Sequence, residues 1–350
     1  MERLNFVDAV DILSSSSDSD SQDDRRPRIV RERNDLFESL DDIEFKRRFR
    51  LTKRTFVRLE GLLCNLPEAR DNRNHPVSKR NQILICLRFF ATGSFQITVG
   101  DLFHVSQPTV SRIITCVIEH IAALLPLFIQ MPQTEQEMRD EATKFYSFGH
   151  LPNIIGAVDC THIKIQLPGG NLAEVYRNRK GWFSINTQII AGSTGKIMDI
   201  VARWPGSVRD TTIFNDSHIR ARFESHHFGQ YVLVGDSGYP CRVYLLTPIV
   251  SPTTISQQQY NTAHARTRNI VERLNGVWKR RFPCLSLGMR LKPEKVCTVI
   301  VATAVLHNIC CIEHDLDDFS DSEVEEESDV PYVNVTDGNS STRDALLTLF

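Results

Sequence analysis

The first half of the chain carries hydrophobic residues at the spacing of α-helices. Between residues 35 and 150, apolar side chains recur at the 3.6-residue period, for example at Phe45, Phe49, Phe56 and Leu59. No alternation typical of strands interrupts this pattern. We therefore predict an all-α domain over residues 35–150.

From about residue 151 the pattern changes to that of an α/β domain. Short apolar runs predict strands at 153–159, 162–167, 184–192, 197–204, 231–236 and 244–250. Ser193–Lys196 predicts a hairpin turn, and helical patterns return at 210–223, 262–281 and 294–313. Three antiparallel strands, a helix, and then strands alternating with helices is the order of an RNase H-like fold. We predict such a domain over 151–313, preceded by the all-α domain.

Residues 81–121 predict a helix-turn-helix. Three helical patterns, 81–92, 97–105 and 107–121, are separated by breaks at Gly93-Ser94 and Ser106. Pro108 suits a first helical turn, with Ser106 or Gln107 as the cap. His104 stands where glycine is commonest in such turns. The residues expected to face a DNA major groove are Gln107, Thr109, Ser111 and Arg112. The alternative is a helical bundle that only supports the following domain.

Charge is strongly segregated along the chain, although the net charge is only −2. Residues 1–24 sum to −6, residues 313–350 to −11, and residues 25–312 to +15. A basic body between acidic ends suits a polyanion such as DNA, and a solvated basic surface is the alternative. We predict disorder for the Ser- and Asp-rich segment 1–34 and for the acidic tail 314–340, and a short amphipathic helix over 341–350.

Smaller signals bear on location and partners. Val10, Ile12 and Leu13 form a short β-prone core before acidic and serine residues, the pattern of a SUMO-interacting motif. The nine cysteines form no Cys-x-x-Cys pair, which favours reduced thiols and excludes a zinc finger. We find no apolar run of about 18–20 residues and no secretory signal, so we expect no membrane span. The expected location is the nucleus, with a cytoplasmic pool.

Three carboxylates stand at positions that suggest catalysis. Asp159 ends the apolar run 154–158 and Asp236 ends the run 232–235, although charges are rare on buried strands unless paired or bound to metal. Glu272 lies on the predicted helix 262–281, with 35 residues between it and Asp236. Oxygen ligands of this kind bind Mg²⁺ or Mn²⁺, which can activate a nucleophile in phosphodiester cleavage. Each acid alone has an ordinary alternative: a turn cap for Asp159, a turn start for Asp236, and an ion pair with Arg268 for Glu272.

Glu272 shares a polar face of its helix with other residues. These are His264, Arg268, Asn275 and Lys279, with Ile270, Leu274 and Val277 packing on the other side. We expect His264, Arg268 and Lys279 to contact DNA, with His264 and Arg268 steadying the scissile phosphate.

The chain resembles the PIF/Harbinger transposases of the IS5-like DDE superfamily over residues 35–312. The matching stretches are RFFATGSFQ (88–96), VSQPTVSR (105–112), GAVDCTHIKI (156–165), YRNRKGWFSINTQ (176–188), WPGSVRD (204–210), GDSGYP (235–240), LLTPI (245–249), YNTAHARTRNIVERLNGVWKRRF (260–282) and VLHNIC (305–310). Each piece is short, but their number and order make the resemblance specific.

The resemblance implies an RNase H-like DDE catalytic domain whose metal-binding acids are Asp159, Asp236 and Glu272. It places Arg177, Arg179 and Lys180 near the active site as phosphate contacts, with an exposed basic loop as the alternative. It also implies a Myb-like DNA-binding partner protein and a homodimer. Where the family often has histidine, this chain has Arg209. We interpret the following Asp210 as the N-cap of its helix, with an acid that supports the metal site without binding the metal as the alternative.

These observations predict a divalent-metal-dependent DNA endonuclease of transposase origin, and they leave open whether strand transfer follows cleavage. Two alternatives stay open. One is a catalytically silent, domesticated DNA-binding regulatory protein, and the other is an RNase H-like nuclease acting on RNA or junctions.

Overall fold

The computed structural model describes residues 35–67, 76–170, 173–315 and 341–348, all of which belong to one compact unit, Arg33–Phe350. The predicted segment 1–34, with Val10, Ile12 and Leu13, lies outside the described residues, as does 316–340 of the acidic tail.

Eight helices precede the first strand in the part of the chain that the structure describes. They are α1 (Leu36–Ser39), α2 (Asp42–Phe49), α3 (Lys53–Leu62), α4 (Lys79–Thr92), α5 (Gln96–Phe103), α6 (Gln107–Ala122), α7 (Leu125–Phe128) and α8 (Glu135–Gly149). The apolar faces of α2 to α6 form one buried cluster because the 3.6-residue period places residues such as Phe45, Phe49 and Phe56 on the inner side, whereas Met138 and Ala142 of α8 belong to a second cluster.

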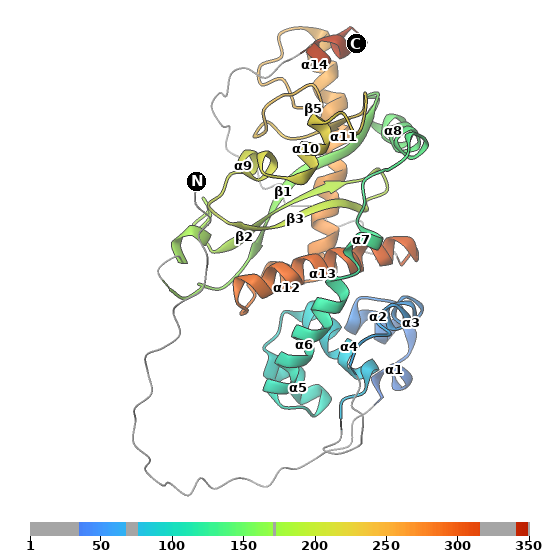
Figure 1. The fold of residues 1–350 in the computed structure, drawn as a ribbon, viewed down its shortest axis with the longest axis vertical. Helices are drawn as coiled ribbons and strands as arrows, with labels where there is room; N and C mark the ends of the chain where they lie inside the picture. Colours follow the sequence, from blue (N-terminus) through green and yellow to red (C-terminus); the bar gives the residue numbers. More distant parts are fainter. Residues whose placement is uncertain (1–34, 68–75, 171–172, 316–340, 349–350) are drawn as a thin grey trace, which may run out of the picture. The chain divides into compact units, whose positions relative to one another are not determined.

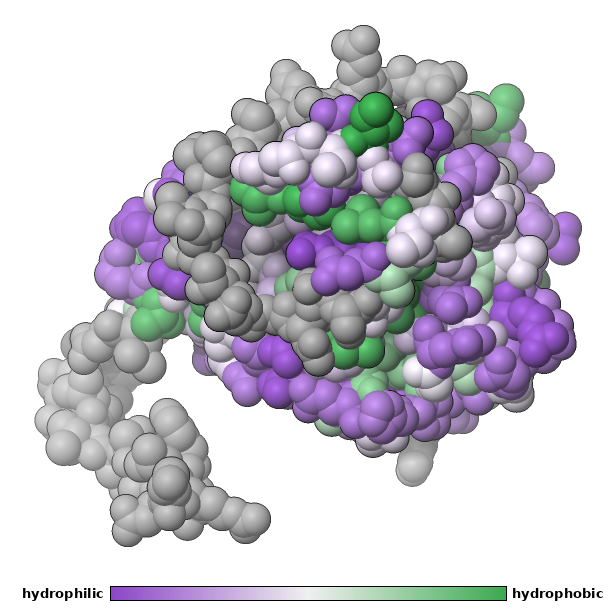
Figure 2. Space-filling view, turned by 90° about the horizontal axis from the view of Figure 1, so that it is seen from above, coloured by the Kyte–Doolittle hydropathy of each residue, from purple (hydrophilic) through white to green (hydrophobic). Residues whose placement is uncertain are grey.

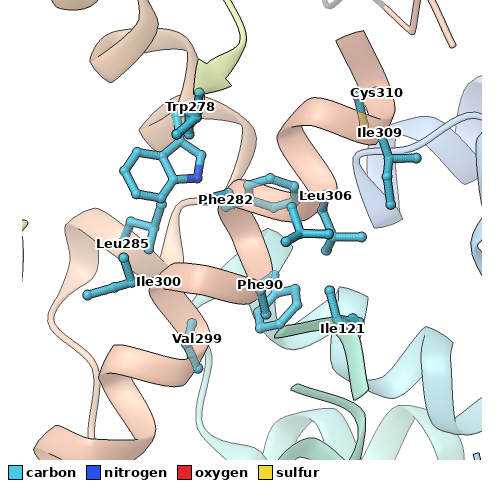
Figure 3. Packing of buried hydrophobic residues seen from close by; sticks show 14 of the residues in the cluster. Phe90, Ile121, Trp278, Phe282, Leu285, Val299, Ile300, Leu306, Ile309 and Cys310 are labelled. Carbon is cyan, nitrogen blue, oxygen red and sulfur yellow. The ribbon is translucent and has the colours of Figure 1, made fainter. Parts of the chain in front are cut away.

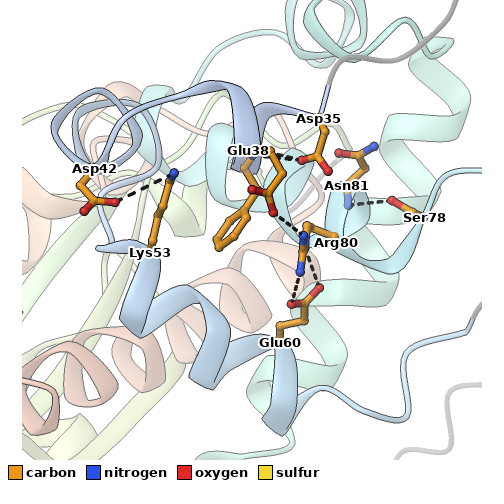
Figure 4. Close-up of polar contacts among 9 residues, drawn as sticks. Asp35, Glu38, Asp42, Lys53, Glu60, Ser78, Arg80 and Asn81 are labelled. Carbon is orange, nitrogen blue, oxygen red and sulfur yellow. Dashed lines mark hydrogen bonds and ion pairs between the residues drawn. The ribbon is translucent and has the colours of Figure 1, made fainter.

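Polar contacts fix the ends of these helices. Ser78 accepts a hydrogen bond from the backbone N–H of Asn81 and caps α4, as Asp35 does for α1 (Figure 4). The guanidinium of Arg80 on α4 donates to both carboxylate oxygens of Glu60, at 3.1 and 3.2 Å. These contacts connect α3 to α4 on either side of residues 68–75.

The second half builds a five-stranded mixed sheet, which confirms the predicted α/β class. Its strands are β1 (Ile154–Lys164), β2 (Ser184–Ala191), β3 (Ile197–Pro205), β4 (Val232–Val234) and β5 (Leu245–Leu246), in the order β3-β2-β1-β4-β5. The first three are antiparallel, whereas β4 and β5 run parallel to β1. The runs 153–159 and 162–167, expected as two strands, contribute to one continuous strand, β1.

Helices cover both faces of this sheet (Figure 1). The helices after β3 are α9 (Asp210–Asn215), α10 (His218–Glu224), α11 (Ile255–Arg281), α12 (Cys284–Leu287), α13 (Pro293–Ile312) and α14 (Ser341–Leu347), and η1 (Ala173–Tyr176) is a short 3₁₀ turn. Successive residues of β2 enter different clusters: Ile189 packs with the cluster of α11 and α13, and Ile190 with that of α9 and α10. This explains why every residue of β2 is buried.

The helix α13 connects the helical half to the sheet. It packs against α6 on one side and β3 on the other, and its residues Ile300, Leu306 and Ile309 lie with Phe90 and Phe282 in the main core (Figure 3). By length and composition this helix could cross a membrane, which corrects our expectation that no such run exists. Because 67% of its apolar window is buried in the protein, we interpret it as a core helix.

The end of α13 is tied to the first helices. The carboxylate of Asp315 accepts hydrogen bonds from the backbone N–H of Thr52 at 2.6 Å and the hydroxyl of Thr55 at 2.9 Å, and it pairs with Lys46 at 3.0 Å. Near the C-terminus, Leu346 and Leu347 of α14 also pack on the core. The face seen in Figure 2 is mainly hydrophilic, with apolar residues in separate patches.

Candidate metal and nucleic-acid site

Two of the predicted acids meet at the ends of neighbouring parallel strands. In the β1–β4 pair, Ala157 lies opposite Val234, and Asp159 and Asp236 each follow two residues later. Both carboxyl groups are half-buried, and the charge of Asp236 raises the pKa of Asp159. The register of the sheet therefore brings together two carboxylates that are 77 residues apart in the sequence.

The helix α11 supplies the other side of the site. The side-chain amide of Asn275 donates a hydrogen bond to a carboxylate oxygen of Asp159 at 3.0 Å. One turn earlier, Glu272 forms an ion pair with Arg268, four residues before it on the same helix. Arg268 also lowers the pKa of Asp159, so the guanidinium that pairs with Glu272 lies near the carboxyl group of Asp159. Among the described residues, however, no group of three or more acidic, histidine or cysteine side chains is arranged to hold a metal ion.

Asp159 is held in an environment that disfavours its charge. Burial raises the pKa of its carboxyl group to about 8, and the negative charges of Asp236 and Asp210 add to this effect. The nearby Arg268 and a hydrogen bond from the backbone at Cys160 act in the opposite direction and do not offset it. A carboxyl group placed in this way is the kind found at functional sites.

Asp210 is a further acid beside Asp159. It is the first residue of α9, whereas the N-cap is Arg209, so our interpretation of Asp210 as the cap is wrong. Its carboxylate instead accepts a hydrogen bond from the buried side-chain amide of Asn186 at 2.8 Å. The helix predicted over 210–223 also divides into α9 and α10, because Ser217 caps a new helix there.

His264 does not lie where its predicted role requires. Its side chain is 2% exposed and contacts the backbone carbonyl of Leu246 at 3.2 Å. Burial lowers its pKa to about 4, so the imidazole is neutral at physiological pH. The expectation of an exposed polar position is wrong because the side chain is buried against the backbone of β5 at Leu246.

The other basic residues predicted to contact DNA are partly engaged within the protein. Arg177 pairs with Glu174 at 2.7 Å and lies over the ring of Phe183, and Lys279 donates to the backbone carbonyl of His162 at 3.2 Å. Arg179 and Lys180 are exposed in the turn before β2. These contacts fix the basic side chains near the sheet, and DNA contact through them stays a prediction.

The helices α5 and α6 present the predicted groove-facing residues. His104 ends α5 in the left-handed conformation, with φ of 51°, and Pro108 lies in the first turn of α6. Ser106 is the N-cap by position, but its hydroxyl lies 3.0 Å from that of Thr109 and makes no cap hydrogen bond. Gln107 and Arg112 are exposed, whereas Thr109 and Ser111 are half-buried.

Two contributors to this site were missing from the predicted set. Asn275 was placed on the polar face of α11 but not assigned to the site, and Asn186 was not considered. The position of Asn275, three residues after Glu272, is a helical spacing that could have identified it. The contact of Asn186 with Asp210 crosses from β2 to α9, and no sequence spacing predicts it.

Comparison with known proteins defines the class. A family model described as "DDE superfamily endonuclease" matches residues 158–308, a range that includes Asp159, Asp236 and Glu272. The chain therefore carries a DDE endonuclease domain of transposase origin.

Its relatives define the family. The chain is 35% identical over 251 residues to the Bos taurus protein named "Putative nuclease HARBI1" and 34% identical to the Homo sapiens protein of that name, covering 71% of each chain. It is 26% identical over 298 residues to "Protein ALP1-like" of Arabidopsis thaliana, which covers 77% of this chain and 71% of the relative. The chain belongs to the PIF/Harbinger family, whose Harbinger-derived members include HARBI1. No solved structure matches it.

Proposed function

We propose that the protein is a divalent-metal-dependent DNA endonuclease that acts through Asp159, Asp236 and Glu272. The observation that carries the proposal is the pairing of Asp159 with Asp236 at adjacent parallel strand ends, where the pKa of Asp159 is raised to about 8. A bound cation would stabilise the ionised form of two carboxyl groups this close together, because it offsets their mutual repulsion. The family supports the reaction type, because its model is that of an endonuclease.

The residues present fit Mg²⁺ or Mn²⁺. The donors are oxygens, which hard cations prefer, and Asn275 adds a buried amide oxygen with no hydrogen-bond partner among the described residues. Asp159 and Asp236 would hold the metal, and Glu272 would complete the set. Bound metal supplies Lewis-acid activation of water and stabilisation of the leaving oxygen in phosphodiester cleavage.

The chain's own residues then have distinct roles in our proposal. Asn275 fixes the orientation of the Asp159 carboxylate by its hydrogen bond. Arg268, half-buried beside Glu272, would meet a substrate phosphate, and Arg179 and Lys180 would hold the flanking backbone. The strand order β3-β2-β1-β4-β5, with three antiparallel strands first, supports an RNase H-like arrangement of this domain.

We further propose that α5 and α6 act as a helix-turn-helix that positions DNA. The exposed Gln107 and Arg112 lie at the start of α6, where recognition helices contact base edges. A Myb-like partner, a homodimer, SUMO binding through Val10, Ile12 and Leu13, strand transfer and a nuclear location remain proposals that follow from the sequence alone.

The experiment that tests this function is cleavage of an end-labelled DNA duplex by the full chain, with Mg²⁺, with Mn²⁺ and with EDTA. We expect metal-dependent nicking that EDTA abolishes and that Asp159→Ala and Asp236→Ala each reduce at least about a hundredfold. The matched control is Asp140→Ala, an exposed acid on α8, outside the proposed DNA-binding helices. DNA binding should persist in all variants.

The binding-only alternative has one observation in its favour, since Glu272 is paired with Arg268 and no metal-ready group of three is present among the described residues. Salt-sensitive DNA binding without cleavage, in the presence of a DNA-targeting partner, would establish that alternative.

A further inference from the structure

Arg268 occupies an unusual place for a cation. It lies one helical turn before Glu272, and its side chain is 25% exposed, against 46% for Glu272. Its Nε–H is buried and has no hydrogen-bond partner among the described residues. Its positive charge also acts on Asp159 and on the buried imidazole of His264. The guanidinium is therefore set among the groups of the carboxylate site and does not point away from it.

The ion pair with Glu272 has a consequence for that site. A carboxylate that accepts a guanidinium is not available as a metal ligand in the same geometry, and a neighbouring positive charge opposes the approach of a divalent cation. In this geometry no group of three or more acidic, histidine or cysteine side chains among the described residues is arranged to hold a metal ion.

We propose that Arg268 is the counter-cation of the carboxylate site in the absence of metal. Its ion pair with Glu272 keeps that carboxylate from binding metal until a metal ion displaces the guanidinium. In the metal-free protein the guanidinium balances part of the acidic charge and keeps Glu272 turned toward it. When metal binds, the ion pair opens and both groups are released, Glu272 toward the metal. The inference rests on the metal site proposed above and adds a regulatory role for a residue of this chain.

The test measures Mn²⁺ affinity of the metal-free full chain by titration calorimetry, without DNA. Arg268→Gln removes the competing charge and frees Glu272, so we expect Mn²⁺ to bind about fivefold more tightly or better. The matched control is Arg273→Gln, which removes an exposed cation from the same helix and should leave the affinity unchanged. The double variant Arg268→Gln/Glu272→Gln should lose the gain.

Several outcomes overturn the proposal. Equal or weaker Mn²⁺ binding by Arg268→Gln means that Arg268 does not compete with metal. If the double variant still binds Mn²⁺ more tightly than the wild type, the gain in affinity comes from the change in net charge and not from the release of Glu272. If Arg268→Gln fails to fold by circular dichroism, Glu272→Gln alone decides. Because the proposal has Glu272 join the metal once it is released, Glu272→Gln should lower the Mn²⁺ affinity, and an unchanged affinity contradicts the proposal.

The result is separable from the proposed function. Wild-type protein that binds Mn²⁺ and cleaves DNA, with no gain in Arg268→Gln, overturns this inference alone. Absence of Mn²⁺ binding by the wild type and by Arg268→Gln overturns the inference together with the metal dependence of the proposed function.

Discussion

Burial and two neighbouring carboxylates raise the pKa of Asp159 to about 8, so its carboxyl group stays protonated in the metal-free fold at neutral pH. The unfolded chain ionises near the ordinary pKa of 3.8. Between these two values only the unfolded state releases the proton, and the folded state loses stability as the pH rises. Binding of a cation reverses this cost because metal requires the ionised carboxylate.

Asp159→Asn should therefore stabilise the metal-free protein. We expect the melting temperature at pH 8 to rise by about 2 °C or more, with the difference shrinking toward pH 4. Differential scanning calorimetry in EDTA at several pH values measures this. Asp101→Asn, an exposed acid, is the control and should show no such pH-dependent gain. A lower melting temperature of Asp159→Asn at pH 8 would contradict the account.

The sequence predicted which residues are candidates for the site better than it predicted their burial and contacts. Asp159 and Asp236 could be found because an acid at the end of an apolar strand is chemically unusual. The alternative for Glu272, an ion pair with Arg268, is present in the structure, because four residues on a helix bring the two side chains together. The burial of His264 could not be predicted, since the segments that cover it come from 18 residues or more away in the sequence.

At the scale of elements, helix boundaries follow local chemistry more closely than the hydrophobic period. The helix α11 begins at Ile255 and not near 262, because Thr254 and Gln257 form a capping box there. Its first two turns are mostly polar, so the spacing of hydrophobic residues did not indicate them. The helix α13 was placed within one residue at each end, because it is apolar on all sides and begins with a proline.

The crossing of α5 and α6 depends on a small residue. A Cβ atom added to Gly100 would lie 2.5 Å from the backbone oxygen of Val105 and 3.4 Å from the side chain of Val110. We expect Gly100→Ala to destabilise the fold by about 1–3 kcal/mol in denaturant unfolding. Gly61→Ala on α3, with nothing within 4 Å, is the matched control and should be neutral or stabilising. Equal stability of the two variants would mean that this crossing is not tightly packed.

At the scale of the whole molecule, the distribution of charge indicates how the protein meets its substrate. The acidic ends and the basic body, +15 over residues 25–312, favour DNA binding that weakens steeply with salt. The sequence predicted the mixed α/β class from the change of pattern near residue 151. The packing of α13 between α6 and β3 could not be predicted from the sequence, because a helix that is apolar on all sides does not indicate which neighbours will cover it.

If α6 contacts DNA, Arg112 supplies part of this charge dependence. We expect Arg112→Ala to weaken duplex binding and to reduce the slope of log affinity against log salt by about 1, as measured by fluorescence anisotropy. Arg139→Ala on α8 is the exposed control. An unchanged slope in Arg112→Ala would show that α6 does not contact the DNA backbone through this residue.

The central claim is that Asp159 and Asp236 hold a divalent metal ion. Its most direct test is anomalous X-ray diffraction from crystals of the full chain with duplex DNA and Mn²⁺. The account predicts an anomalous peak between the carboxylates of Asp159 and Asp236 that disappears in Asp159→Asn. Mn²⁺ bound elsewhere, or no peak beside a well-ordered DNA phosphate, would contradict it.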